Sequence, residues 1–429
     1  MKLKIVAHTI VPELDPNDKL GEFRKLTEEE LKILSNSTHY DSNESFDIYK
    51  ALLLSAKLAG ICYMKENFDK ILNESAETSF RRLKTVLTSG HHSVFDHFHI
   101  TFEISNIPKI LAMFLNNEKN YTTSEKSARY TKYENLTDIQ GELYNKWVGK
   151  LSKVIKETYP CLYKEKAKNP MLAIEKLAQE NARYFVSIFE PLTTMAYTTS
   201  LRQWNYLIYM FEKYISQCDY LSCMFEDYKL KNFDDQALPA LKEFLSLAKE
   251  YQVEGLIPFN KVRTLSLIGD PAYADIQDTF SYVYQTSYYA SYACFAQVQR
   301  HRSEHCFLYN DIKKFILPEI ISSDNALSKE WLNDGSKVID IHPQGRIVKI
   351  VQTGNIDTFI MKYEERCCGS TQLETMRHQV EIADKIVQNS IYADKLLEIT
   401  GGHTARCLFK NGFCNNKCML GSKQIERNI

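Results

Sequence analysis

The chain has 429 residues, 44% of them hydrophobic and 25% charged, and its formal net charge is −1. This length predicts two or three domains with sizeable hydrophobic cores, and the balanced charge excludes a bulk field that would recruit nucleic acid or a membrane surface. A local basic pocket is still compatible with these numbers.

The first residues, MKLKIVAHTIVPELD, contain no signal-like apolar region. No apolar run approaches the roughly 20 residues that a membrane span needs. We therefore expect a cytoplasmic protein that binds no membrane, and we expect its eleven cysteines to be reduced thiols.

Short strands and long helices alternate along the chain. Strands are predicted at 3–11 and 98–106, and helices at 44–61, 76–89, 107–116, 138–158, 171–183 and 201–232. After a charged helical stretch at 225–258, the pattern predicts a strand at 261–269, an aromatic-rich segment at 279–296, a basic helix at 296–307 and a strand at 345–354 that enters a helix near Asn355.

Two similar beginnings, at 3–11 and 261–269, favour two related halves. We therefore expect a mixed α+β fold in which each half has a small sheet flanked by long helices. The predicted boundaries are 1–225 for the first half, 226–258 for a helical linker, 259–400 for a shortened second half and 401–429 for a cysteine-containing tail.

The segment AQVQRHRSEHCF, at 296–307, places three basic residues side by side. Gln297 precedes Arg300 by three positions and His301 by four, so a helix would present these side chains on one face. Guanidinium groups such as that of Arg302 form forked hydrogen bonds with phosphate oxygens, and a histidine adds a donor or titrates near neutral pH. The alternative is a solvated, charged helix face, which is the more common role of such a run.

The pattern Gln-x-x-Arg-His-Arg resembles the flavin-dependent thymidylate synthases. In that family, Arg-His-Arg is followed by seven residues and then by Ser-x-Arg-Tyr. Here the residues after Arg302 read SEHCFLYND, whereas Ser-Ala-Arg-Tyr stands in the first half at 127–130. At the family spacing before Ser127, the first half reads Asn-Glu-Lys at 117–119. The first half thus keeps the second part of the motif, and the second half keeps the first part.

Other segments of the first half also resemble the family. GHHSVFDHFHITFEI, at 90–104, is similar to the family's Gly-His-x-Ser/Thr-x-x-Glu-His segment, with Asp96 in place of the glutamate. A later stretch keeps three polar positions of the family, which are Arg183, Ser200 and Arg202. At the end of the following helix, Phe211 replaces the family's catalytic arginine.

The second half shows the complementary losses. It keeps the family's asparagine at Asn355 and places Arg366 where the first half lacks the catalytic arginine. It has Ile339 at the counterpart of Arg183, and Asp357 where the family has an arginine. The resemblance therefore implies a tandem in which unlike halves form one intact composite site.

Carried over position by position, the resemblance implies three groups of site residues. Arg366 would be the catalytic residue, because a cation there stabilises charge that develops on the pyrimidine ring. The implied nucleotide ligands are Glu125, Ser127, Arg129, Arg183, Gln297 and Arg300. The implied flavin ligands are His91, Ser93, Arg202, Arg300, His301, Arg302 and Asn355. His91 is also compatible with an ordinary loop histidine, and Arg202 would compensate for the charge missing at Asp357.

The resemblance implies that the protein methylates dUMP to dTMP with reduced FAD and methylenetetrahydrofolate, and that NADPH is the reductant. It also implies a homodimer that forms a pseudo-tetramer, because each chain holds two subunit equivalents. The composite site then lies either within one chain or between chains. Two alternatives stay open, namely a related flavoenzyme acting on another pyrimidine nucleotide and a nucleotide-binding homologue without catalysis. The ligand is a small nucleotide, not a nucleic acid, in each case.

Cysteines gather in the tail, where Cys407, Cys414 and Cys418 follow His403. Such residues suit a four-coordinate zinc site, but their spacing is not a standard one and the resembled family has no such metal. We therefore expect no metal site.

Overall fold

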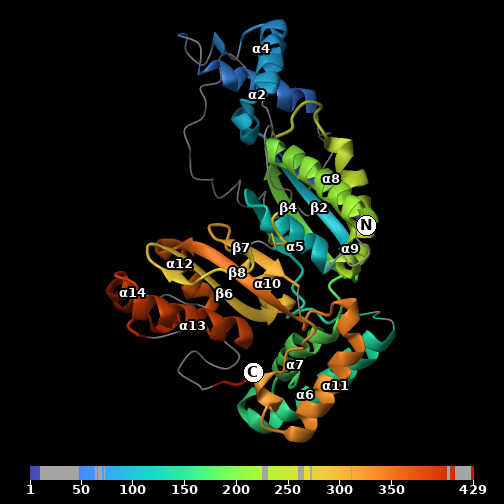
Figure 1. The fold of residues 1–429 in the computed structure, drawn as a ribbon, viewed down its shortest axis with the longest axis vertical. Coiled ribbons are helices and arrows are strands. Elements are labelled where there is room, and N and C mark those ends of the chain that lie inside the picture. The colour runs from blue at the N-terminus through green and yellow to red at the C-terminus, as the bar shows by residue number, and fades with distance from the viewer. Residues whose placement is uncertain are drawn as a thin grey trace.

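The computed structural model describes residues 1–9, 48–62, 65, 70–71, 73–134, 136, 138–224, 230–258, 265–270, 273–310, 312–402, 406–410 and 427–429. Two four-stranded antiparallel sheets, each flanked by helices, form the mixed α+β structure that the sequence predicts (Figure 1). Within the described ranges, no helix combines the length and the hydropathy that crossing a bilayer requires.

The first sheet has the strand order β1-β2-β4-β3. Its strands are β1 (Lys2–His8), β2 (His99–Ile107), β3 (Tyr121–Glu125) and β4 (Thr193–Ser200). Burial alternates along β2, where Ile100, Phe102 and Ile104 are fully buried, because successive side chains of a strand point to opposite faces. The described helices before residue 250 are α2 (Ile48–Gly60), α4 (Ala76–Ser89), α5 (Lys109–Asn117), α6 (Asp138–Thr158), α7 (Leu172–Ala182), α8 (Leu201–Met224) and α9 (Lys231–Ala248).

The second sheet has the strand order β5-β6-β8-β7. Its strands are β5 (Thr279–Phe280), β6 (Val283–Ser291), β7 (His305–Tyr309) and β8 (Ile347–Asn355). The accompanying helices are α10 (Tyr292–Val298), α11 (Asn325–Val338), α12 (Ile356–Arg366), α13 (Leu373–Asn389) and α14 (Ala393–Thr400).

The two sheets share one topology. In each, the second strand leads through a short helix, α5 or α10, into the third strand, and the fourth strand leads directly into α8 or α12. The helical segment before the fourth strand ends in a short 3-10 turn, which is η3 (Arg183–Phe185) in the first half and η7 (Ile339–Ile341) in the second. Ile339 is therefore the structural counterpart of Arg183, as the sequence pattern predicts.

The counterpart segments meet at a local pseudo-two-fold axis. Ser187 and Pro343 occupy equivalent positions after η3 and η7, and they form an antiparallel bridge. The flanking hydrogen bonds are also paired by this symmetry and run from Ile188 N to His342 O (3.0 Å) and from Gln344 N to Val186 O (2.8 Å). Exchanging the halves exchanges these two bonds, so the halves contact each other through equivalent backbone.

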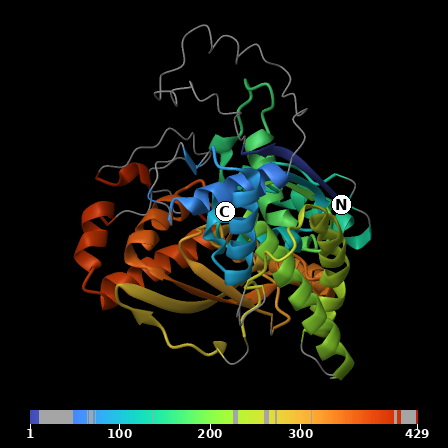
Figure 2. The same cartoon turned by 90° about the horizontal axis from the view of Figure 1, so that it is seen from above.

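Two hydrophobic cores are shared between the halves. The larger one joins α5 and α8 of the first half to α10 and β8 of the second. The other packs α6 and α7 against α11 through the rings of Trp147, Phe185 and Trp331. These three helices lie together at the lower end of Figure 1, and Figure 2 shows the orange and red helices of the second half beside the green helices of the first. Shared cores make the halves one structural unit.

The basic helix predicted at 296–307 is wrong beyond Val298. Helix α10 ends there, and Arg300–Arg302 lie in the turn that leads to β7. Cys306 and Leu308 are buried on alternate positions of that strand, which pairs with β8. Strand pairing therefore overrides the helical spacing read from the sequence.

The strand predicted at 261–269 lies partly outside the described residues. Over 265–269 the chain forms no strand and makes one bridge, between Ile268 and Leu308. The amide of Leu308 also donates to the Leu267 carbonyl (2.9 Å), so the segment runs along β7. The first strand of the second sheet is β5.

Candidate active site

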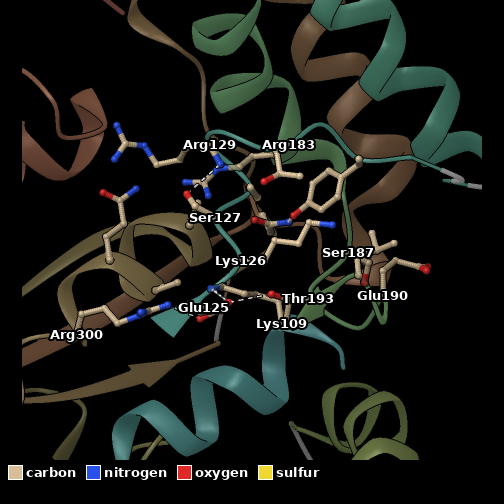
Figure 3. Close-up of a pocket in the computed structure, with 18 of the residues that line it drawn as sticks. Lys109, Glu125, Lys126, Ser127, Arg129, Arg183, Ser187, Glu190, Thr193 and Arg300 are labelled. Atoms are coloured by element: carbon tan, nitrogen blue, oxygen red, sulfur yellow. Dashed lines mark hydrogen bonds and ion pairs between the residues drawn. The ribbon is translucent and has the colours of Figure 1, made fainter. Parts of the chain in front are cut away.

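A cavity of about 210 Å³, lined mostly by polar and charged residues, lies between the two halves (Figure 3). The seven residues predicted to bind or activate the nucleotide all line it, and they are Glu125, Ser127, Arg129, Arg183, Gln297, Arg300 and Arg366. The first four come from the first half and the last three from the second. Pockets for drug-sized ligands typically enclose roughly 300–1,000 Å³, and here the lining side chains reduce the space by binding one another.

The first half contributes its part of the cavity from the end of β3 and from η3. Glu125 is the last residue of β3, and Ser127 and Arg129 follow in a turn where the Thr131 amide donates to the Ser127 carbonyl (3.0 Å). Arg183 begins η3, directly after α7. These backbone positions are fixed by the sheet and by the core of α6 and α7, so the cations converge without belonging to one continuous motif.

The second half contributes from the ends of two helices. Gln297 is the next-to-last residue of α10, and Arg300 lies in the turn after it. Arg366 is the last residue of α12. A cation at the C-terminal end of a helix is favoured by the helix dipole, and burial together with nearby arginines lowers the pKa of Arg366.

Glu125 connects the two halves inside the cavity. Its carboxylate, only 1% exposed, accepts a bond from Lys109 Nζ (2.6 Å) and pairs with Arg300 of the other half. Asn116 and Thr193 also donate to it, each at 3.3 Å. Burial raises the pKa of Glu125, but the charges of Lys109 and Arg300 outweigh burial and keep the pKa below its usual value. The carboxylate is therefore ionised and neutralised from both sides.

Arg129 is held by two acceptors on different sides. Its Nε lies 3.1 Å from Glu180 Oε2, and its Nη2 donates to the carbonyl of Ser370 in the second half. Glu180 itself is buried on α7. A ligand phosphate that reaches Arg129 would share the guanidinium with these acceptors or displace the Ser370 carbonyl.

Gln372 forms hydrogen bonds with two of the predicted nucleotide ligands, Arg183 and Gln297. Its Oε1 accepts from Arg183 and from Gln297 Nε2 (2.6 Å), which belong to different halves. Its Nε2 donates to Tyr184 OH (2.5 Å). The side chain is buried at the start of α13. One amide thus sets the position of two predicted nucleotide ligands.

Sequence reasoning gave no role to two residues of this site, Lys109 and Glu180, and it noted Gln372 only as part of the Gln-Leu-Glu segment at 372–374 that the second half keeps from the family. For Lys109 a signal was available, because it is the one charged residue of the apolar helix α5, KILAMFLNN. Burial lowers the pKa of Lys109, and its contact with Glu125 offsets this only in part. Glu180 gave no such signal, since its contacts come from segments far away in the sequence.

Two of the predicted flavin ligands lie next to the cavity. Arg302 Nη1 donates to the Tyr121 carbonyl and to Thr122 Oγ1 (3.2 Å), across the boundary between the halves. His301 is mostly buried, and burial together with the charge of Arg366 lowers its pKa to about 2. His301 is therefore neutral at physiological pH and offers one donor and one acceptor.

The other predicted flavin ligands do not line the cavity in the described part of the chain. His91 and Ser93 are exposed around the start of η1 (His92–His97). Arg202, at the start of α8, forms an ion pair with Asp96 (Nε to Oδ1, 3.1 Å). Their roles stay predictions.

Asn355 also lies outside the cavity. Its Oδ1 accepts the Thr358 amide (2.9 Å) and caps α12. The helix has 11 residues, so this cap lies about 16 Å along the axis from Arg366. Asn355 therefore has a structural role in this arrangement.

Most of the residues considered for a zinc site in the tail lie outside the described ranges. Cys407 lies in η8 (Arg406–Leu408), whereas His403, Cys414 and Cys418 fall outside the described residues. Among the residues that are described, no three histidine, cysteine or acidic side chains form a group suited to a metal ion.

Comparison with known protein families finds a match in the first half. Residues 48–217 match the family model described as thymidylate synthase complementing protein. This segment is similar to that family. The match includes β2 to β4 and η1, and therefore Glu125, Ser127, Arg129 and Arg183. The predicted resemblance to thymidylate synthases is confirmed for this part of the chain.

Two solved structures from Helicobacter pylori are similar to the chain. One is thymidylate synthase X with FAD and dUMP, at 14% identity over 48% of this chain and 90% of that one, with a TM-score of 0.26. The other is a flavin-dependent thymidylate synthase complexed with FAD and dUMP, at 16% identity over 47% and 96% of the two chains, with a TM-score of 0.24. No curated protein matches the sequence.

Proposed function

We propose that this protein is a flavin-dependent thymidylate synthase that methylates dUMP to dTMP at one composite site between its unlike halves. One observation carries the proposal. The seven residues that the family pattern assigns to the nucleotide, four from one half and three from the other, line a single cavity. The family match of 48–217 supports the same activity.

The phosphate of dUMP would bind to Arg129 and Arg183. Both guanidiniums now bind oxygen atoms of protein groups, including the neutral acceptors of Ser370 and Gln372. A dianionic phosphate is a stronger acceptor for such a fork than a neutral carbonyl or amide. The Ser127 hydroxyl lines the same cavity and would add a donor.

Arg366 would act on the pyrimidine ring. Its Nε is buried without a hydrogen-bond partner among the described residues. A buried cationic donor is costly to leave unpaired, so a ligand carbonyl is a favourable partner. As negative charge develops on the uracil oxygen, a fixed guanidinium stabilises the transition state more than the ground state.

An anionic cofactor fits the cationic groups beside the cavity. Two of these cations have nitrogen atoms that are buried without hydrogen-bond partners within the described residues, namely Nε of Arg300 and Nζ of Lys119, and the same holds for Nε2 of the neutral His301. A flavin pyrophosphate needs donors of this kind. When bound, reduced FAD would supply a hydride and methylenetetrahydrofolate the carbon, with NADPH reducing the flavin. Arg300, His301 and Arg302 would hold the cofactor, and the neutral state of His301 preserves an acceptor there.

A nucleotide-binding homologue without flavin chemistry is the second candidate. One specific observation favours this candidate. Arg202 forms an ion pair with Asp96, and the Asn355 side chain caps α12. Two of the predicted flavin ligands are thus occupied by structural contacts. Such a protein would keep the phosphate arginines but would not need the flavin groups.

The deciding experiment measures release of the C5 hydrogen from labelled dUMP. We expect release that depends on FAD, NADPH and methylenetetrahydrofolate, and we expect one flavin per chain, because one composite cavity is complete. Binding of dUMP without hydrogen release or flavin would favour the second candidate. Absence of dUMP binding would refute both. Size-exclusion light scattering tests the proposed homodimer, in which two chains form a pseudo-tetramer.

A further inference from the structure

The segment Arg427–Ile429 lies against the loop at 367–372 that joins α12 to α13. The Arg427 side chain is almost fully buried. Its guanidinium donates to three backbone oxygens, those of Gly369 (2.5 Å), Thr371 (2.7 Å) and Ile429 (2.9 Å). Buried, charge-assisted bonds of this kind are among the stronger polar contacts in proteins, so the loop is braced at two points.

Residues of the braced loop contact side chains that line the cavity. It follows Arg366 directly and ends at Gln372, which accepts from Arg183. Between the two braced carbonyls lies Ser370, whose carbonyl accepts from Arg129. Moving this loop would therefore displace both phosphate arginines.

We propose that Arg427 is a positioning residue of the nucleotide site. By fixing the carbonyls on both sides of Ser370, it holds Arg129 and Gln372 in the arrangement that receives a nucleotide phosphate. This proposal rests on the proposed function for the identity of the ligand. Arg427 itself does not line the cavity and acts through the loop.

The terminal segment has anchors that do not involve the loop. Tyr159 OH donates to Asn428 Oδ1 (2.8 Å), and the Asn428 amide donates to Tyr159 OH (3.1 Å). Ile429 is buried in the core shared by α6, α7 and α11. Removing the Arg427 guanidinium can therefore free the loop while the segment itself keeps its place.

The test compares three variants of the full chain, Arg427→Ala, Arg427→Lys and Tyr159→Phe, by calorimetric titration with dUMP. We expect the dissociation constant to rise about tenfold for Arg427→Ala. Lysine keeps the charge but lacks the planar fork, so an intermediate rise is expected for Arg427→Lys. Tyr159→Phe perturbs the same segment without touching the loop, and less than a twofold change is expected.

Hydrogen exchange separates this proposal from the proposed function. In the absence of any nucleotide, Arg427→Ala should speed amide exchange in peptides that cover 367–372, and Tyr159→Phe should not. If the wild-type protein fails to bind dUMP, the proposed function is wrong and loop exchange still decides whether Arg427 fixes the loop. Unchanged loop exchange, or unchanged dUMP affinity in a binding-competent protein, would overturn the positioning role. If Arg427→Ala does not fold, the same two readouts on Arg427→Lys decide it.

Discussion

Equivalent positions on the two sides of the pseudo-two-fold axis have opposite character. On one side, Lys126 and Glu190 line the open cavity. Their counterparts by chain position, Asn310 after β7 and Arg346 after η7, contact the buried His342 instead (3.3 and 3.4 Å). The backbone is symmetric, but the side chains are not. Symmetry of the fold therefore does not imply two sites.

The halves meet at two symmetry-related junctions. The open junction contains the cavity, and at the second, filled junction side chains occupy the equivalent space. The ring of His342 packs against Phe189 and Phe233 and bonds to Asn232 (2.9 Å) and Tyr292 (3.2 Å). Two of these contacts come from α9, which lies within the predicted linker. The linker therefore supplies groups that a second nucleotide would have to displace, and we expect one nucleotide per chain.

The largest expected effect comes from neutralising Glu125. Glu125→Gln would leave the partly buried Lys109 and Arg300 without their counter-charge, and we expect a cost at the lower end of the about 3–5 kcal/mol that breaking a buried pair takes. Tyr309 occupies the equivalent strand end at the other junction, where its hydroxyl donates to the uncharged Asp270 carbonyl (3.1 Å). We expect Tyr309→Phe to cost about 1 kcal/mol. Urea unfolding measures the free energy of unfolding of both variants. Equal losses in the two variants would contradict the proposed difference between the two junctions.

Replacing Arg366 tests whether the reaction takes place in the cavity at the open junction. We expect Arg366→Met to lower kcat for C5 hydrogen release by about 10²–10³-fold, the usual cost of removing one donor to a developing oxyanion. The affinity for dUMP should fall much less. Arg81→Met, at an exposed position on α4, serves as the control for loss of an arginine. A kcat that survives in Arg366→Met would exclude this residue from the chemistry.

The buried histidine of the filled junction predicts acid sensitivity. Burial and Arg346 lower the pKa of His342 to about 3, whereas an unfolded histidine titrates near 6.5. The unfolded state therefore binds more protons between pH 3 and 6.5, so the free energy of unfolding falls as pH falls through this window. His342→Asn suits the positive φ of 50° at this position and should reduce the slope by up to about 1.4 kcal/mol per pH unit.

Denaturation between pH 4 and 7 checks this expectation. His97→Asn, at an exposed position in η1, is the matched control and should leave the slope unchanged. His301 at the open junction also has a depressed pKa, so part of the slope will persist in His342→Asn. A slope identical to that of the wild type would mean that His342 is not buried in its neutral form.

Local signals made several elements predictable from the sequence. The helices predicted at 76–89 and 138–158 coincide with α4 and α6. Helix α4 begins after Ser75, which accepts the Thr78 amide (3.3 Å), and ends at Gly90, whose φ of 78° suits glycine. Such caps are encoded within a few residues, which is why the bounds are accurate.

The site was predictable only as a set of residues. The family pattern named seven of the residues that line the cavity, because each of these belongs to a short motif. Two further groups, Glu180 and Arg427, were not predictable, because their partners lie far away in the sequence and depend on how the halves meet. The turn at Arg300–Arg302 was misread as helix for the same reason, since pairing of β7 with β8 decides it.

The smallest expected effect concerns the starts of α8 and α12, where the halves differ by Arg202 and Asp357. Asp357 is exposed and contacts Lys395 (3.2 Å) and Tyr282 (3.1 Å), so its replacement should change stability little. If α12 begins near the flavin, as Asn355 predicts, Asp357→Arg should raise FAD affinity about two- to fivefold, the scale of one exposed charge contact. Asp357→Asn, which removes the negative charge alone, should give a smaller gain. Equal FAD affinity in the wild type and both variants would mean that the flavin does not bind near the start of α12. The start of α8, where Arg202 keeps the family's arginine, would then be the place to look for the flavin.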